Sequence, residues 1–272
     1  MFAQALISFR ESFEAAILVV IVVLYLKRIN KSYLIPYVIL GSFIGIILSI
    51  ITGISAHMLY FIAEIKEVAE AVASFVAVLV LTSVIYWMTI KGKGIKQSVE
   101  MKTEEAVRKG SLISMVSLGF IFVFREGFET VLFTLPLIFS QPVETTSGVS
   151  IGIIPSLVLA YLIFKGALKI RLKTFFFVTS ILIVLIASGI LGYGVHELIE
   201  YWEETGYSLG VWDEPIYELP FSEDNPLHDE GIVGSLLAIF IGYTTKMELL
   251  RFVLQFTYLV IGLSLIIYAT KK

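Results

Sequence analysis

The chain has 272 residues, of which 57% are hydrophobic and 16% are charged, and its formal net charge is −3. Soluble domains contain about 45–50% apolar residues, so this composition, with a mean hydropathy of +0.90, excludes an ordinary soluble domain and predicts a membrane protein. The sequence has no cysteine, which excludes disulfides, iron–sulfur clusters and thiolate metal sites.

Seven stretches are long and apolar enough to cross a bilayer as helices, which takes about 20 mostly apolar residues. In chain order they are 3–26, 34–61, 68–90, 111–139, 149–165, 174–198 and 247–270. The apolar stretch 231–243 is too short to span, and we predict a re-entrant or interfacial segment there. The predicted fold class is all-α, a polytopic membrane protein with seven transmembrane helices. The first residues lack the basic region of a signal peptide, so we expect the first helix to remain in the mature protein.

The basic residues are concentrated in alternate loops, and this bias indicates how the chain is oriented. Fifteen of the 20 lysines and arginines follow the first, third, fifth and seventh predicted spans. Those segments are expected to be cytoplasmic, which places the N-terminus outside and the C-terminus inside. The opposite loops are acidic, above all the loop 201–230, which is either a solvated cover or a surface that concentrates cations at an entrance.

Charged residues also lie inside the first and fourth predicted spans, with the same spacing in both. They are two arginines and four glutamates: Arg10, Glu11, Glu14, Arg125, Glu126 and Glu129. Each ionised side chain at mid-membrane costs about 2.5–3.5 kcal/mol, so we expect them to face the protein interior, pair with one another or meet an ion. Residues three or four apart share a helix face, so the glutamates of one span point the same way and each arginine can reach the second glutamate.

The two R-E-x-x-E motifs stand 115 residues apart, which predicts an internal repeat within a single membrane domain. Repeat 1 covers about 1–90 and repeat 2 about 111–200, with a cytoplasmic loop at 91–110 between them. The outer loop 201–230 and a last segment, 231–272, follow. Three spans per repeat is an odd number, so the second repeat is inverted and the substrate site is expected at the repeat interface. Ser12 and Gly127 are small and are expected to let the two charged helices approach closely.

Four carboxylates in one layer of the membrane repel one another unless counter-charge is present. The two arginines leave a net charge of −2, which a bound multivalent cation would balance. Oxygen ligands without thiolate favour a hard cation, and Fe³⁺, Mg²⁺, Mn²⁺ and Ca²⁺ all fit. We predict that Glu11, Glu14, Glu126 and Glu129 are metal ligands and that Arg10 and Arg125 are their charge partners. The alternative is a lattice of salt bridges that only holds the helices together.

A second, shallower site is predicted where the third and sixth spans reach the outer surface. Polar side chains gather there: Glu67, Glu70, His196, Glu197 and Glu200. Carboxylate oxygens and imidazole nitrogens are both metal ligands in proteins.

With these residues in place, the sequence resembles the oxidase-dependent iron transporter family, the high-affinity iron permeases of fungi and bacteria. That family carries two R-E-x-x-E motifs, in the first and fourth of its seven helices, and both motifs stand here at the expected places. The runs 67–70, 86–88, 194–200 and 211–213 and the pair Gly242-Tyr243 also look like the family pattern. The resemblance covers essentially the whole chain.

The resemblance implies a permease that takes up iron, in the ferric form made by a ferroxidase partner, with the four motif glutamates as ligands. Iron is then the transported substrate, and no prosthetic group is expected. This sequence shows neither the long cytoplasmic tail of fungal members nor the extracytoplasmic extension of some bacterial ones. The resemblance therefore leaves the oxidase partner unidentified. We expect a prokaryotic plasma membrane, and as partners membrane lipid and a ferroxidase or an extracytoplasmic iron-binding protein. No nucleic acid is expected, and assembly into a homo-oligomer stays open.

Three other functions remain open from the residues alone. One is a divalent or lead cation permease on the same scaffold, and another is a proton-coupled transporter of an organic cation. The third is a membrane scaffold or sensor in which the charges are purely structural. The sequence has no G-x-x-x-x-G-K-[ST] loop and no evident nucleophile–base arrangement, so we do not expect an ATP-driven pump or an enzyme.

Overall fold

The structure is a computed structural model that describes residues 1–61, 65–91, 94–166, 172–222, 225–228, 233–234, 237–238 and 242–271. Long helices make up most of it: α1 (Phe2–Arg28), α2 (Ile35–Phe61), α3 (Lys66–Lys91), α5 (Leu112–Ser140), α6 (Pro142–Phe164), α7 (Leu172–Glu204) and α9 (Leu249–Lys271). The shorter helix α4 covers Ile95–Arg108, and two strands, β1 (Pro215–Glu218) and β2 (Lys246–Glu248), pair antiparallel. The predicted all-α class is confirmed, with this small sheet as its only described departure.

The outer surface of the helix bundle is apolar, as a membrane requires. Five helices, α2, α3, α6, α7 and α9, are long and apolar enough to cross a bilayer. On α2 alone, Phe43, Ile47, Ile50 and Ile54 are each more than half exposed, and water would not tolerate a continuous patch of this kind. The two other long helices, α1 and α5, carry the R-E-x-x-E motifs. The structure therefore supports a polytopic membrane protein, while the count of seven spans stays a prediction.

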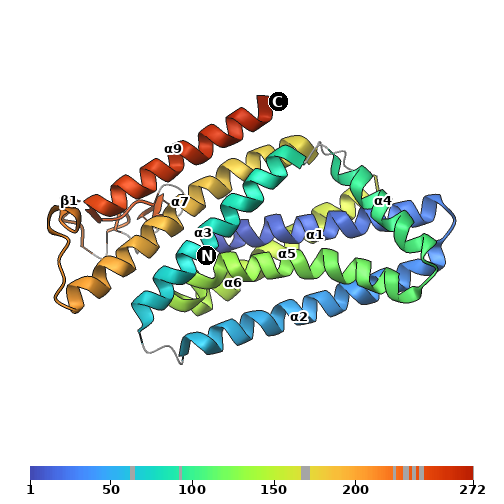
Figure 1. Cartoon of the computed structure of the whole chain (residues 1–272), viewed down its shortest axis with the longest axis horizontal. Coiled ribbons are helices and arrows are strands. Elements are labelled where there is room, and N and C mark those ends of the chain that lie inside the picture. The colour runs from blue at the N-terminus through green and yellow to red at the C-terminus, as the bar shows by residue number, and fades with distance from the viewer. Residues whose placement is uncertain are drawn as a thin grey trace.

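The two motif helices run through the middle of the molecule, with α2 and α9 towards its two sides (Figure 1). The most extensive packing joins α2 to α5, α1 to α6 and α3 to α7, while α9 packs mainly on α7 and also on α3. Helix α4 lies at one end of the molecule and the β1–β2 sheet at the other (Figure 1). We refer to these as the α4 end and the sheet end.

Glycines bring α2 against α5 and α6 against α1. A Cβ added at Gly45 would lie 2.9 Å from the backbone nitrogen of Phe124, and one at Gly152 would lie 2.8 Å from that of Phe9. Real Cβ atoms rarely come so close to a backbone atom, so both positions require glycine. Close backbone approach through small residues is a common means of packing membrane helices.

The two glycine contacts correspond to each other residue by residue. Phe9 and Phe124 are 115 residues apart, the same offset that separates the two motifs. One turn earlier, Gly41 and Gly148 repeat the relation, since they meet the backbone of Val116 and Met1, which are again 115 residues apart. Two inverted repeats would produce this pattern, although the repeat itself stays a prediction.

The ends of two predicted spans were wrong. Helix α6 begins at Pro142 rather than at 149, and α7 continues to Glu204 rather than ending at 198. Polar residues did not stop α6, because the hydroxyls of Thr146 and Ser147 donate to carbonyl oxygens four residues earlier. Acidic residues outside the predicted spans therefore belong to helices: Glu144, Glu200, Glu203 and Glu204.

Helix α4 and both strands were missed by the sequence analysis. Helix α4 occupies most of the predicted loop 91–110, and Val99, Thr103 and Ala106 form its buried face against α1 and α5. Strand β2 occupies the start of the predicted last span, because Met247 and Glu248 pair with β1. The helix α9 therefore begins two residues later than predicted. The predicted re-entrant stretch lies largely outside the described residues, as do 223–224 and 229–230 of the acidic loop.

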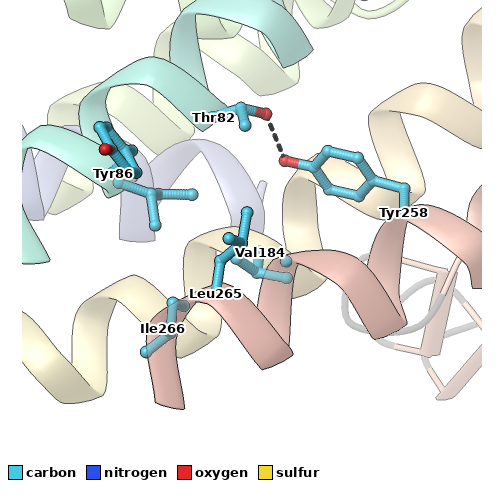
Figure 2. Close-up of a pocket in the computed structure, with 8 residues that line it drawn as sticks. Thr82, Tyr86, Val184, Tyr258, Leu265 and Ile266 are labelled. Atoms are coloured by element: carbon cyan, nitrogen blue, oxygen red, sulfur yellow. Dashed lines mark hydrogen bonds between the residues drawn. The ribbon is translucent and has the colours of Figure 1, made fainter. Parts of the chain in front are cut away.

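A small pocket lies where α9 meets α3 and α7 (Figure 2). It is lined mostly by apolar side chains, and the Tyr258 hydroxyl is 2.7 Å from Thr82 Oγ1 across it. A Cβ at Gly262 would lie 2.8 Å from Val184 Cγ1, so α9 also packs closely on α7. No charged side chain lines this pocket, so it is not a candidate ion site. The side chains around it belong to the packing of α9 on α3 and α7.

Candidate metal centre

Three buried carboxylates meet between α1 and α5. Glu11 comes from α1, and Glu126 and Glu129 come from α5. Each offers an oxygen atom that lies within 4.8 Å of the oxygens of the other two. Their exposed fractions are 0%, 4% and 8%. Such a cluster inside a helix bundle is either neutralised by bound cations or protons, or strongly destabilising.

One oxygen of each carboxylate is buried without a hydrogen bond. Within the described part of the chain, Oε2 of Glu11, Glu126 and Glu129 has no hydrogen-bond partner. An unsatisfied buried acceptor costs about 1–3 kcal/mol, and a charged one costs more. Three carboxylates that meet in this way are therefore suited to bind a positive ion.

The fourth predicted ligand, Glu14, lies outside the group of three. Its Oε1 is 2.9 Å from Nη2 of Arg10, and Arg10 also bonds through Nη1 to Oε1 of Glu11. Arg10 is 1% exposed, so it joins both acids of α1 within the protein interior. The structure thus brings together three of the four predicted ligands, and it holds the fourth against an arginine.

The second predicted charge partner has a different environment. Arg125 Nε is 2.9 Å from Glu129 Oε1 and 4.0 Å from Glu126 Oε1, and 44% of the Arg125 side chain is exposed. Arg125 has one close acid partner, whereas Arg10 bonds to both acids of its motif. The two motifs therefore place the same residue types in unequal surroundings.

The predicted role of Ser12 and Gly127 in bringing the two motif helices together was wrong for Gly127. A Cβ at Gly127 would overlap Ser49 of α2, so this glycine packs against α2 and not against α1. Successive helical residues are about 100° apart around the helix axis. Because Glu126 points towards α1, its neighbour Gly127 is directed towards a different helix.

Apolar packing lies on both sides of the carboxylates. Towards the α4 end, both helices contribute to one packed apolar cluster, which comprises Phe13, Ile17, Ile21, Leu118 and Phe122 together with Val99 and Ala106 of α4. Towards the sheet end, a second apolar cluster includes Ala3 and Ile7 of α1 and Phe133 of α5. Buried polar residues also lie on that side, and Gln4 and Ser8 are hydrogen-bonded to α6.

The residues of the predicted outer site do not meet as one group. Glu70 contacts two tyrosines, whereas His196 contacts Glu248. Glu70 is buried and accepts hydrogen bonds from Tyr60, at 2.6 Å, and from Tyr193. His196 Nδ1 lies 2.9 Å from Oε1 of Glu248. Glu197 interacts electrostatically with Glu70 and His196, and hydrogen-bonds to Tyr193. Of the remaining two, Glu67 is half-buried and Glu200 is exposed.

Three members of this outer network were not found from the sequence: Tyr60, Tyr193 and Glu248. Tyr193 stands four residues before Glu197 on α7, and that spacing is a signal that could have revealed it. Glu248 gave no such signal, because its position depends on β2 pairing with β1. Burial alone would raise the pKa of Glu248, but the hydrogen bond and charge of His196, with Arg251 nearby, hold this pKa below its usual range.

Comparison with known proteins identifies the family. The sequence pattern of the iron permease FTR1 family matches residues 1–268. The chain belongs to this family. The predicted resemblance to iron permeases is therefore confirmed, over nearly the full length of the chain.

Relatives of this FTR1-family permease align along almost their whole length. An uncharacterised protein of Archaeoglobus fulgidus is 38% identical over 272 residues, which cover 98% of this chain and 94% of the relative. The ferrous iron permease EfeU of Yersinia pestis is 28% identical over 271 residues, covering 97% and 93%. The ferrous iron permease EfeU of Escherichia coli O6:K15:H31 is 27% identical over 266 residues, covering 96% and 93%. No solved structure matches the chain.

Proposed function

We propose that this permease moves iron across the plasma membrane into the cell through the carboxylates of Glu11, Glu126 and Glu129. The observation that carries the proposal is their geometry: three buried carboxylates from two helices, each with an oxygen that lacks a hydrogen-bond partner in the described part of the chain. Oxygen ligands without thiolate suit hard or borderline cations, iron among them. Membership of an iron permease family supports iron as the substrate.

The arginines compensate for the negative charge while the site is empty. Arg10 bonds to Glu11 and to Glu14, so it balances one of the two negative charges on α1 before iron arrives. When iron binds Glu11, the guanidinium can remain with Glu14, which keeps that carboxylate in reserve as a fourth ligand. Arg125 acts in the same way on Glu129, which lies 2.9 Å from it.

The proposed direction of transport follows from the charge of the two ends. With the N-terminus outside, the sheet end faces out, and iron approaches past the acidic segment 201–230. The apolar cluster towards α4 then closes the inner side, and it has to separate before iron reaches the cytoplasm. A site that opens to one side at a time is the general plan of transporters built from inverted repeats.

The oxidation state of the transported iron is best tested directly. The sequence resemblance implied ferric iron and a ferroxidase partner, whereas two relatives are named as ferrous iron permeases. The purified protein is placed in liposomes, and the rate of Fe²⁺ uptake under anaerobic conditions is compared with the rate of uptake of chelated Fe³⁺. We expect the two rates to differ by at least about tenfold, since carboxylate sites discriminate by ligand charge and number. Addition of Pb²⁺ or Mn²⁺ as competitor separates an iron permease from a general divalent or lead permease.

The site itself is tested with amide variants of the three carboxylates. Glu126→Gln and Glu129→Gln keep the size of the side chain but remove a charge, so iron flux into liposomes is expected to be lost while the protein still inserts and folds. The matched control is Glu104→Gln, which makes the same change at an exposed residue of α4. Normal flux in both site variants would defeat the proposal. Flux that needs a pH gradient but no metal would instead support proton-coupled transport of an organic cation.

A further inference from the structure

A buried carboxylate on α3 is held by two tyrosines from neighbouring helices. Glu70 is 8% exposed. Tyr60, in the last turn of α2, donates a hydrogen bond to its Oε1 at 2.6 Å, and Tyr193 of α7 donates one to its Oε2. One phenol therefore lies at each oxygen of the carboxylate. Three oxygen-bearing side chains from three different helices meet at this point.

The packing around this group keeps the two phenols in place. The Tyr60 ring stacks on Phe139 of α5, with the ring centroids 4.4 Å apart. Directly after Tyr193, a Cβ added at Gly194 would lie 2.6 Å from the Cβ of Ser74, so α7 and α3 are in close contact here. Both tyrosines are half-buried. The group is thus fixed by the protein without being fully enclosed.

The arrangement of donors and acceptor is one that a ferric ion can replace. Oxygen ligands suit hard cations, and tyrosine is the protein ligand of haem iron in catalase. A phenol keeps its proton at neutral pH, but a bound cation can displace the proton of its ligand. Both phenol hydrogens already point at Glu70. An ion that binds there would form two bonds to phenolate oxygens, and the two displaced protons would pass to water.

The charge of the group selects between the two oxidation states of iron. One carboxylate and two phenolates carry three negative charges, which the three positive charges of Fe³⁺ neutralise. A divalent ion on the same ligands would leave one negative charge without compensation, and such a charge is costly in a buried place. The centre between α1 and α5 offers carboxylates only. The two groups therefore differ in the kind of oxygen ligand as well as in position.

We propose that Tyr60, Glu70 and Tyr193 form a second iron site, selective for Fe³⁺, where α2, α3 and α7 meet. Of the residues predicted for an outer site, this one uses Glu70 alone and adds two tyrosines. Iron binding here does not depend on the proposed transport through the centre between α1 and α5.

The site is tested on the full chain in detergent, loaded with ferric nitrilotriacetate. Phenolate bound to Fe³⁺ absorbs visible light by charge transfer, and carboxylate does not, so iron between α1 and α5 does not contribute. We expect a visible band on loading, and resonance Raman spectra excited in that band are expected to show tyrosinate vibrations. Fe²⁺ added anaerobically is expected to give no band. Absence of the band from the unmodified protein loaded with Fe³⁺ would overturn the proposal, whether or not any variant folds.

Two phenylalanine variants locate the band. Tyr60→Phe and Tyr193→Phe each remove one phenol oxygen and keep the ring, so each is expected to weaken Fe³⁺ binding by at least about tenfold. The double variant is expected to lose the band. Tyr258→Phe is the matched control, because it removes a phenol that is hydrogen-bonded to Thr82 rather than to a carboxylate. It is expected to leave the band unchanged.

A band that survives in the double variant would place the iron at other tyrosines and overturn the proposal. Glu126→Gln separates this site from the transport centre. That variant is expected to lose iron flux in liposomes and to keep the visible band in detergent. Normal flux in Glu126→Gln would count against the transport centre alone, whereas loss of the band in that variant would count against an independent site.

Discussion

The two R-E-x-x-E motifs have nearly the same letters but different environments. In the α1 motif, Arg10 is buried and bonds to both Glu11 and Glu14. In the α5 motif, Arg125 is half-exposed, and it lies 2.9 Å from Glu129 and 4.0 Å from Glu126. Each motif therefore presents a different balance of charge to the space between the helices.

The difference suggests a division of roles between two motif helices that are packed in corresponding ways. The glycine contacts that pack α2 on α5 and α6 on α1 correspond residue by residue, so the frame around the two motifs is alike. The charges within the frame are not alike: α5 contributes two acids to the group of three, and α1 contributes one acid and the buried arginine. A cation site can thus be asymmetric even where the backbone that holds it is close to symmetric.

The largest expected effect distinguishes the two arginines. Arg10→Gln leaves two buried acids without their partner, and breaking a buried ion pair in this way costs roughly 3–5 kcal/mol of stability. Arg125→Gln is expected to cost less, because Arg125 has one close acid partner and Arg10 has two. Thermal unfolding of both variants in the same detergent measures the difference. Equal losses would mean that the two motifs are equivalent after all.

A smaller effect compares Glu129 with Glu14. Glu129 belongs to the group of three and Glu14 does not, so Glu129→Gln is expected to weaken iron binding by at least about tenfold more than Glu14→Gln does. Anaerobic Fe²⁺ titration of the purified variants measures both affinities. Equal affinities would show that Glu14 joins the bound ion on the same terms as Glu129.

The packing on the two sides is expected to respond equally. Gly45→Leu and Gly152→Leu each force a side chain into a backbone contact, and overpacking of this kind costs roughly 1–3 kcal/mol. Gly94→Ala is the control, because an added Cβ meets nothing within 4 Å there. Similar losses of thermal stability at the two glycines, with little change at Gly94, would support the inverted repeat. A loss at one glycine only would argue against it.

The smallest effect is expected for an arginine–glutamate pair outside the interior. Arg28 Nη2 lies 3.3 Å from Glu100 Oε2, with 59% of the Arg28 side chain exposed. Arg28→Gln is expected to change stability by less than about 1 kcal/mol. The same thermal unfolding experiment compares Arg28→Gln with Arg10→Gln. The difference between the two losses of stability measures how much burial strengthens an arginine–glutamate pair.

The sequence predicted the long helices and the group of buried charges well, because both rest on strong signals. Long apolar runs need a lipid environment, and an acid such as Glu126 inside one of them requires a partner. The sequence could not show that Arg10 would be buried and Arg125 half-exposed, since the motifs have the same spacing. Helix α4 and strand β2 were missed because they are short and polar, and their burial depends on distant parts of the chain.

The residues of the predicted outer site also have contacts that the sequence could not predict. Glu70 and His196 were predicted to belong to one site, and the structure gives each a different immediate partner. Those partners, Tyr60 and Glu248, lie at the ends of predicted spans and belong to none of the motifs. Their positions are set by how α2 and β2 pack, which a single sequence does not encode in any local pattern.

The reciprocal glycine packing has a consequence for how the chain can be divided. The first helix of each half rests on the second helix of the other half, so neither half contains the surface that covers its own glycine-lined helix. A fragment that ends before α4 would leave α2 without its partner helix, and the complementary fragment would do the same to α6. We therefore expect the halves to be unstable when produced singly, and to regain a stable assembly only when both are made in the same cell.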